Sequence, residues 1–167
     1  PGTERDVLKN INLTFRPGET VVLVGLNGAG KTTLIKLLTR LYDPTEGVIL
    51  LDGKDLREYD VQDLYSMFGI IFQDFGKYAF TVTENIHFGD IEKKLDMEEI
   101  KEAARQSGAD EYIEKLTQGY DTPLMRIFEA QGLELSGGQW QKLALSRLLF
   151  KNDAKLLILD EPTASLD

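Results

Sequence analysis

The chain has 167 residues and a formal net charge of −9, with 42% hydrophobic and 28% charged residues. This length suits one globular domain with a sizeable core. The acidic balance argues against nucleic acid as the main partner, because phosphate backbones favour a basic surface. The absence of cysteine excludes disulfides and thiolate metal sites. The sequence has neither an apolar run of ~18 residues nor a signal-peptide pattern, so we expect any work at a membrane to need a partner or a further segment.

The first third of the chain predicts strands around one helix. Apolar residues alternate over 7–15, the period of a half-buried strand. A turn at 16–19 leads to a buried strand over 20–24. A helix is expected from residue 32 to 38. Further elements are a strand over 47–51 and a tight turn at Asp52-Gly53.

The remainder predicts a helical region between two strands. A short helix over 61–67 precedes an apolar strand over 69–72, which ends at Gln73. Helices are expected over 96–107, where Asp96 and Glu99 resemble a capping box, over 110–116 and over 140–150. The strand at 155–159 is apolar on both faces, as a central parallel strand should be. The pattern predicts an α/β core (1–74 and 151–167) with an inserted helical subdomain (75–150).

Residues 25–32 form a phosphate-binding pattern, G-x-x-x-x-G-K-T, between a predicted strand and a predicted helix. The residues are Gly25, Leu26, Asn27, Gly28, Ala29, Gly30, Lys31 and Thr32, and Thr33 follows in the first turn. Glycines let backbone N–H groups approach a polyphosphate, and the helix N-terminus favours negative charge. Lys31 can reach the β- and γ-phosphates, and the Thr32 hydroxyl can bind magnesium. A glycine-rich turn that only caps a helix is the alternative, which the two flanks disfavour. The sequence predicts binding of a nucleoside triphosphate.

Two acids follow the last predicted strand. Asp160 and Glu161 come directly after four apolar residues, so the strand would deliver them to the crevice where α/β folds bind ligands. Asp160 would hold magnesium, and Glu161 would polarise a water that attacks the γ-phosphate. A strand that simply ends in solvated acids is the alternative.

A second glycine-bearing helix start occurs at Leu135-Ser136-Gly137-Gly138-Gln139. Ser136 is suited to cap the helix, and the glycines expose backbone N–H groups. Since one triphosphate needs only one such loop from each chain, we expect this one to cap a nucleotide held by another subunit. A helix start without a ligand is the alternative.

Together these motifs resemble the nucleotide-binding domain of an ATP-binding cassette (ABC) transporter. The matching segments are 25–32 (Walker A), Gln73 (Q-loop), 135–139 (signature), 156–161 (Walker B and catalytic glutamate) and 165–167 (D-loop). The resemblance implies a P-loop NTPase core with a mainly parallel sheet, N-terminal antiparallel β-strands and the helical subdomain. It also implies a fragment cut at both ends.

The resemblance implies an ATPase with ATP and Mg²⁺ as cofactors. Its catalytic residues would be Glu161, Gln73 and Lys31, and its magnesium ligands Thr32, Gln73 and Asp160. Two such domains would pair head to tail, with Ser136, Gly137, Gly138 and Gln139 of one on the ATP of the other, and Asp167 reporting across the dimer. A transmembrane domain would dock through coupling helices at the cytoplasmic face of a membrane.

Finer resemblances indicate an exporter of peptide, lipid or drug. They lie at 83–86, 119–122 and 139–144. An importer ATPase, a soluble ABC ATPase without transport and a non-hydrolysing module are the alternatives, the last disfavoured by Glu161. Four aromatic residues near Gln73 could receive a coupling helix or simply pack in the core, namely Phe72, Phe75, Tyr78 and Phe80.

The sequence also departs from the exporter pattern. Ala130-Gln131-Gly132 stands where exporters usually carry Glu-Arg-Gly, in a segment (123–134) that is a few residues longer than usual. The adenine-stacking aromatic would precede Pro1, and the switch histidine would follow Asp167. His87 is read as an ordinary surface or packing residue. We expect weak or no turnover from the fragment alone.

Overall fold

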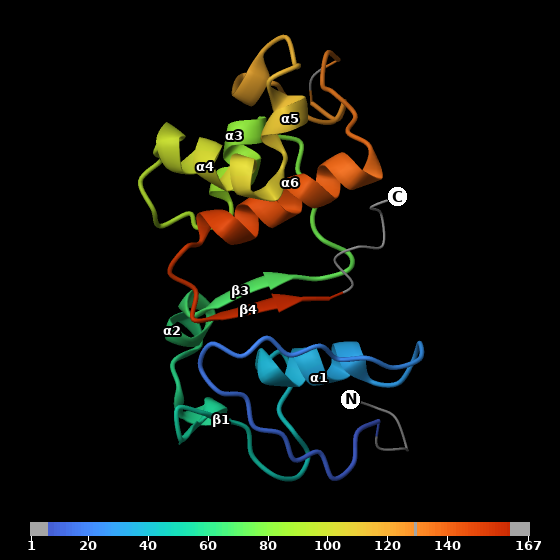
Figure 1. Cartoon of the computed structure of the whole chain (residues 1–167), viewed down its shortest axis with the longest axis vertical. Helices are drawn as coiled ribbons and strands as arrows, with labels where there is room; N and C mark the ends of the chain where they lie inside the picture. Colours follow the sequence, from blue (N-terminus) through green and yellow to red (C-terminus); the bar gives the residue numbers. More distant parts are fainter. Residues whose placement is uncertain (1–6, 129, 161–167) are drawn as a thin grey trace. The chain divides into compact units, whose positions relative to one another are not determined.

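The computed structural model describes residues 7–128 and 130–160. The chain divides into two compact units, Pro1–Tyr65 and Ser66–Asp167, which are described separately. Figure 1 traces both units and labels most of their helices and strands. Glu161 and Asp167 lie outside the described residues.

Unit one contains a helix and a small β-hairpin. Its elements are α1 (Lys31–Leu38), β1 (Leu50–Leu51), β2 (Lys54–Asp55), the 3₁₀ turn η1 (Leu56–Glu58) and α2 (Val61–Ser66), which continues to the first residue of unit two. β1 and β2 pair antiparallel, with Leu50 opposite Asp55. Asp52 and Gly53 both have positive φ, 51° and 80°, as a two-residue hairpin turn requires. The predicted turn here is confirmed.

The half-buried strand predicted over 7–15 and the buried strand predicted over 20–24 are absent from the described part of unit one, and with them the expected N-terminal antiparallel β-strands. Only the turn between them forms, where the Glu19 N–H donates to the Arg16 carbonyl at 3.1 Å. A strand forms when its backbone groups pair with a neighbour, and no described segment pairs with these residues. Their side chains are accordingly exposed, Val22 at 76% and Val24 at 90%. The hairpin β1–β2 is the antiparallel pair of this unit.

Unit two consists of a parallel strand pair and a group of helices. β3 (Phe68–Ile71) pairs in parallel with β4 (Leu156–Leu159), with Ile71 opposite Leu159. The helical elements are α3 (Val82–His87), α4 (Met97–Ser107), α5 (Asp110–Ile113), η2 (Gly119–Asp121) and α6 (Gly137–Phe150). In Figure 1, α6 lies between the strand pair and helices α3 to α5. Within unit two, β4 is not buried on both faces as predicted: Ile158 is buried, whereas Leu157 and Leu159 are exposed, because the helices of this unit cover one face of the strand pair.

Local capping explains where the helices of unit two begin. Thr81 and Glu84 form a capping box at α3, and Ser136 and Gln139 form another at α6. Asp96 caps α4 as predicted, but its carboxylate accepts from the Glu98 N–H rather than pairing with Glu99. The Glu99 carboxylate instead binds the Lys93 ammonium at 3.1 Å.

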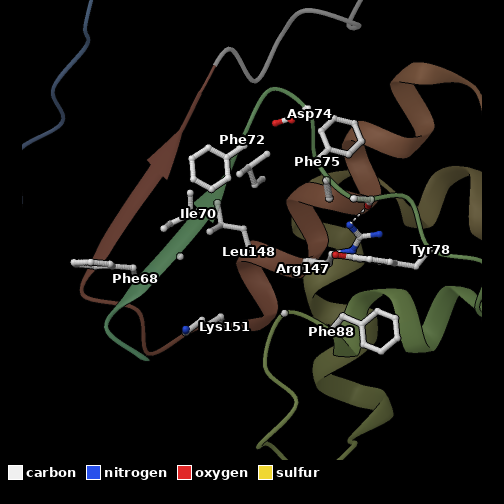
Figure 2. Close-up of a pocket in the computed structure, with 15 residues that line it drawn as sticks. Phe68, Ile70, Phe72, Asp74, Phe75, Tyr78, Phe88, Arg147, Leu148 and Lys151 are labelled. Carbon is white, nitrogen blue, oxygen red and sulfur yellow. Dashed lines mark hydrogen bonds between the residues drawn. The ribbon is translucent and has the colours of Figure 1, made fainter. Parts of the chain in front are cut away.

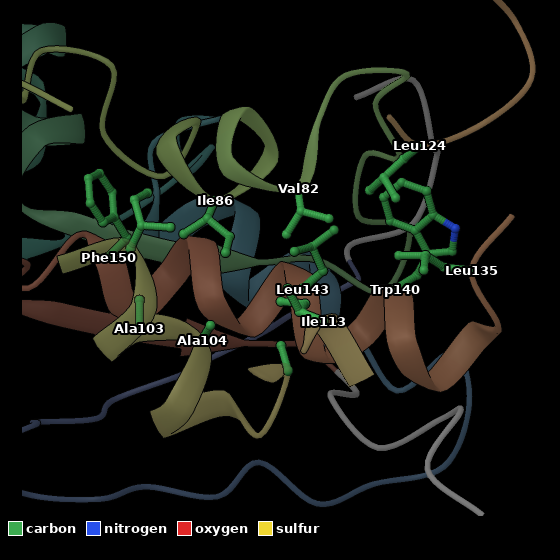
Figure 3. Close-up of a cluster of buried hydrophobic side chains, with 12 residues drawn as sticks. Val82, Ile86, Ala103, Ala104, Ile113, Leu124, Leu135, Trp140, Leu143 and Phe150 are labelled. Carbon is green, nitrogen blue, oxygen red and sulfur yellow. The ribbon is translucent and has the colours of Figure 1, made fainter. Parts of the chain in front are cut away.

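A hydrophobic core joins α6 to the other helices. Figure 3 shows side chains from α3, α4, α5 and the segments before α6 converging on one side of α6. Trp140, Leu143 and Phe150 are the contributions of α6, all at most 2% exposed. Ala103 and Ala104 on α4 are small enough for a close helix approach, and a 2.7 Å hydrogen bond links the hydroxyls of Ser107 and Ser146 across it. The core therefore fixes where α6, and the signature residues at its start, stand in unit two.

Candidate functional site

The predicted phosphate loop in unit one is a compact turn that ends in a helix. The Ala29 N–H donates to the Leu26 carbonyl at 3.1 Å, and α1 begins at Lys31. Gly28 and Gly30 have φ of 81° and 92°, a region that other residues rarely adopt. At Gly30 a Cβ would also lie 2.7 Å from the Leu8 side chain. The backbone conformation therefore favours glycine at position 30, and a larger residue would also have to displace the Leu8 side chain.

The Lys31 ammonium is folded over this loop. Its Nζ donates to the carbonyl oxygens of Gly25 at 2.8 Å and Leu26 at 3.3 Å. Gly30, the N-cap, supplies no side-chain hydrogen bond, and the first turn of α1 carries no acidic residue. The N–H groups of that turn and the lysine together make a site that favours an anion. Thr32 is exposed in this first turn, and Thr33 is half-buried.

The signature residues begin α6 in unit two. The Ser136 Oγ accepts from the Gln139 N–H at 3.3 Å, and the Gln139 Oε1 accepts from the Ser136 N–H at 2.9 Å. The serine hydroxyl still has its own proton to donate, and the N–H groups of Gly137 and Gly138 belong to the first turn. The Gln139 side chain thus caps the helix in this structure. Its backbone carbonyl accepts a hydrogen bond at 3.3 Å from Tyr112, whose pKa is raised by burial.

Gln73 and Asp160 lie at the same edge of the strand pair. Asp160 directly follows β4, is 5% exposed, and its N–H donates to the Ile71 carbonyl at 2.9 Å. Gln73 is two residues past the end of β3 and is exposed in a turn. The parallel register therefore brings these two predicted residues to the carboxyl ends of neighbouring strands. The predicted magnesium ligands offer a hydroxyl, an amide and a carboxylate oxygen, a donor set that suits Mg²⁺. The described residues contain no cluster of three or more acidic or histidine side chains able to hold a metal alone.

The predicted residues thus fall in separate parts of the molecule. Residues 25–33 belong to unit one, while Gln73, Asp160 and residues 136–139 belong to unit two. Within unit two, β3 and β4 bring Gln73 close to Asp160, and α6 carries Ser136 at its N-terminus.

A pocket of about 390 Å³ lies between β3 and α6 in unit two. Figure 2 shows Phe72, Phe75 and Tyr78 around it, with Arg147 reaching in from α6. Phe80 is outside this lining and packs edge-on against Phe88, with ring centroids 5.2 Å apart. Sequence reasoning missed Arg147. The available signal in the sequence was a single cation within the mostly apolar helical run 143–150.

Two further expectations concern the segment 123–134 and His87, the last residue of α3. Among the described residues of 123–134, Leu124 and Leu133 form an isolated parallel bridge, and Ile127 and Phe128 are exposed at 63% and 79%. His87 packs edge-on against Phe150, and its Nε2 lies 2.9 Å from the Lys93 carbonyl oxygen. The arrangement agrees with the interpretation of His87 as a packing residue.

The described helices include none that is long and apolar enough to cross a membrane. A family model described as "ABC transporter" matches residues 8–164.

Similar proteins carry related descriptions. The chain is 44% identical over 167 residues to an ATP-dependent lipid A-core flippase of Alkalilimnicola ehrlichii, covering all of this chain and 27% of the flippase. It is 42% identical over 161 residues to ABC transporter B family member 29, chloroplastic, of Arabidopsis thaliana (96% and 25% covered). Among solved structures, a bacterial Atm1-family ABC exporter with ATP bound matches with a TM-score of 0.76 and 38% identity, over 85% of this chain and 24% of that chain. The chain thus spans about a quarter of the length of these relatives.

Proposed function

The chain belongs to the ABC transporter family, and from this premise we propose that it binds and hydrolyses ATP to power export across a membrane. The observation that carries the proposal is the Lys31 ammonium held by the Gly25 and Leu26 carbonyl oxygens at the start of α1. A polyphosphate that enters the loop offers this charge stronger acceptors than neutral carbonyls. The helix N-terminus adds further favourable field.

We propose that Gln73, Asp160 and Glu161 complete the hydrolytic site. Thr32, Gln73 and Asp160 are the residues that would hold Mg²⁺, and the ion, when bound, neutralises charge on the β- and γ-phosphate oxygens. Glu161 accepts a proton from the attacking water. The position of Asp160 supports its part, because it directly follows β4 and so lies at the carboxyl end of the parallel strand pair, where α/β folds bind ligands.

The second helix start supports a two-domain ATP site. The Ser136 hydroxyl and the N–H groups of Gly137 and Gly138 form an anion-binding end of α6. In the proposed dimer this end contacts the γ-phosphate of a nucleotide bound to the phosphate loop of a second such domain, with Gln139 as the cap and Asp167 at the dimer interface. Closure of the dimer then depends on the third phosphate of ATP, and hydrolysis allows the dimer to open.

The proposed setting is the cytoplasmic face of a membrane, where a transmembrane domain contacts unit two through coupling helices. The names of the relatives, a lipid A-core flippase and an ABC exporter, support export over import. In the proposed division, residues 1–74 and 151–167 form the ATP-binding core, and residues 75–150 form the helical subdomain.

The proposal is tested with Glu161→Gln in the full-length protein. This variant keeps the site's shape and removes the carboxylate base, so ATP with Mg²⁺ should accumulate a dimer that ADP does not support. Sedimentation velocity reads the dimer, and released phosphate reads the lost turnover. Wild-type turnover without any ATP-dependent dimer in Glu161→Gln would contradict the proposal.

A further inference from the structure

Arg147, in the last turn of α6, binds residues that are distant in the chain. Its Nε and Nη2 donate to the backbone and side-chain oxygens of Asn85 at 2.9 and 2.6 Å. Its Nη1 donates to the Gly76 carbonyl at 2.5 Å, the hydrogen bond drawn in Figure 2. The guanidinium also lies 4.7 Å from the centroid of the Tyr78 ring, within cation–π range. One side chain of α6 thus holds both α3 and the segment that follows Gln73.

Asn85 extends this network along the same segment. It is fully buried, and its Nδ2 donates to the carbonyl oxygens of Tyr78, Phe80 and Thr81 at 3.1, 3.2 and 2.9 Å. Residues 73–80 contain no helix or strand, and of their carbonyl groups those of Tyr78 and Phe80 also accept backbone N–H groups, from Phe80 at 2.9 Å and from Leu124 at 3.0 Å. Arg147 and Asn85 together fix the path of the chain from Gly76 to the start of α3.

The backbones of α3 and α6 are also in direct contact at this point. Gly89, just past α3, lies so close to α6 that a Cβ there would be 2.0 Å from the Arg147 carbonyl oxygen. Val82 and Ile86 of α3 pack into the same core as Leu143. These contacts make α3 and α6 one packed body, and Arg147 connects that body to Gly76, three residues from Gln73.

The chemistry of the guanidinium makes this connection specific to arginine. Burial lowers the pKa of Arg147 to about 10, which leaves the group charged at neutral pH. Charge-assisted hydrogen bonds are stronger than neutral ones, and the planar fork of the guanidinium fits this set of acceptors in a way that the compact ammonium of a lysine does not reproduce. Arg147→Lys therefore keeps the charge while removing most of the links.

We propose that Arg147 is a positioning residue that couples the signature helix to the segment carrying Gln73. When Ser136 and its glycines engage a nucleotide, α6 is held, and Arg147 holds residues 76–81 with it. The inference rests on the proposed function, since it presupposes that nucleotide engages the start of α6. The inference adds a route by which nucleotide contact at the start of α6 influences the position of Gln73, through α6, Arg147 and Asn85.

Hydrogen–deuterium exchange of the full-length protein separates the two claims. In the wild type, ATP with Mg²⁺ should slow exchange in residues 25–32, which reports nucleotide binding, and in residues 76–81, which reports coupling. Arg147→Lys should keep the first protection and the ATP affinity, lose the second, and lower kcat about tenfold. Absence of protection at 25–32 in the wild type would contradict the proposed function itself.

Leu148→Ala is the matched control, because it removes a buried side chain of the same helix turn and leaves the hydrogen bonds of Arg147 in place. It should lower Tm yet keep both protections and the kcat of the folded protein. The inference is wrong if Arg147→Lys retains protection at 76–81 with unchanged kcat, or if Leu148→Ala loses that protection equally. Should Arg147→Lys not fold, Tyr78→Leu at an exposed position carries the test. It is expected to weaken protection at 76–81 and to lower kcat, and no change in either would overturn the inference.

Discussion

Replacing Gly89 by alanine should separate α3 from α6 and destabilise unit two. The added Cβ would lie 2.0 Å from the carbonyl oxygen of Arg147 and 2.8 Å from its carbonyl carbon. Ordinary contact begins near 3.4 Å, so the oxygen is about 1.4 Å too close. The obstructing atoms belong to a helix backbone and cannot rotate away, so the two helices must move apart.

Two effects lower the free energy of unfolding in Gly89→Ala. Forcing a methyl group into a packed contact costs about 1–3 kcal/mol. A helix shift of this size also stretches the Arg147–Asn85 bonds of 2.6 and 2.9 Å beyond hydrogen-bond range, and losing charge-assisted bonds costs about 1.5–3 kcal/mol. We expect Gly89→Ala to lower the free energy of unfolding by about 3–5 kcal/mol.

Trp140 is a built-in probe for this measurement, since it is the chain's single tryptophan and is 2% exposed in the core of unit two. Urea unfolding followed by its fluorescence gives the free energy for wild type and variant. Gly119→Ala is the control: it adds the same methyl group at a φ of +50° with no atom within 4 Å, so it should cost about 1–2 kcal/mol from backbone strain alone. Equal losses for the two variants would refute the close approach of α3 and α6.

Three other variants test separate parts of the account. Lys31→Ala should weaken ATP binding about 10- to 100-fold, because a charge-assisted contact worth about 1.5–3 kcal/mol is lost; unchanged affinity by titration calorimetry would contradict the role of the loop. Ser136→Ala should cost about 1 kcal/mol of stability as a lost cap and abolish ATP-dependent dimers, while nucleotide still binds the phosphate loop. Because burial raises the pKa of Tyr112 above its ordinary value of 10.0, the unfolded chain loses that proton first, and stability should fall as pH rises above 10. Tyr112→Phe should make this fall shallower in urea titrations at increasing pH, and an unchanged slope would show that Tyr112 does not contribute.

The sequence correctly predicted the features that depend on residues close together in the chain, such as caps, turns and helix starts. The Ser136 cap, the Asp52-Gly53 turn and the helix after Gly30 follow from local rules, and all are present. The prediction of N-terminal strands was wrong, because a pattern of apolar residues describes only one strand of a β-ladder. No described segment supplies the second strand with which it would pair.

The missed part of the candidate site is long-range. Arg147 contacts Asn85 and Gly76, which are 62 and 71 residues away in the chain, and no local pattern encodes such a pairing. The use of the Gln139 side chain in the cap was missed for a different reason. The residue fits both a ligand contact and a capping box; the 2.9 Å bond to the Ser136 N–H shows that the capping box forms, and the contact with ATP stays a prediction.

The central claim is that the phosphate loop of one chain and the α6 start of another hold the same nucleotide, and a mixed dimer tests it most directly. In a Glu161→Gln background, one copy carries Lys31→Ala and the other carries Ser136→Ala, and labelled ATP retained per dimer is counted. The account predicts that neither variant alone forms a dimer that retains ATP, whereas the mixed dimer keeps one complete site and retains one nucleotide. A mixture that retains no more than either variant alone would contradict it.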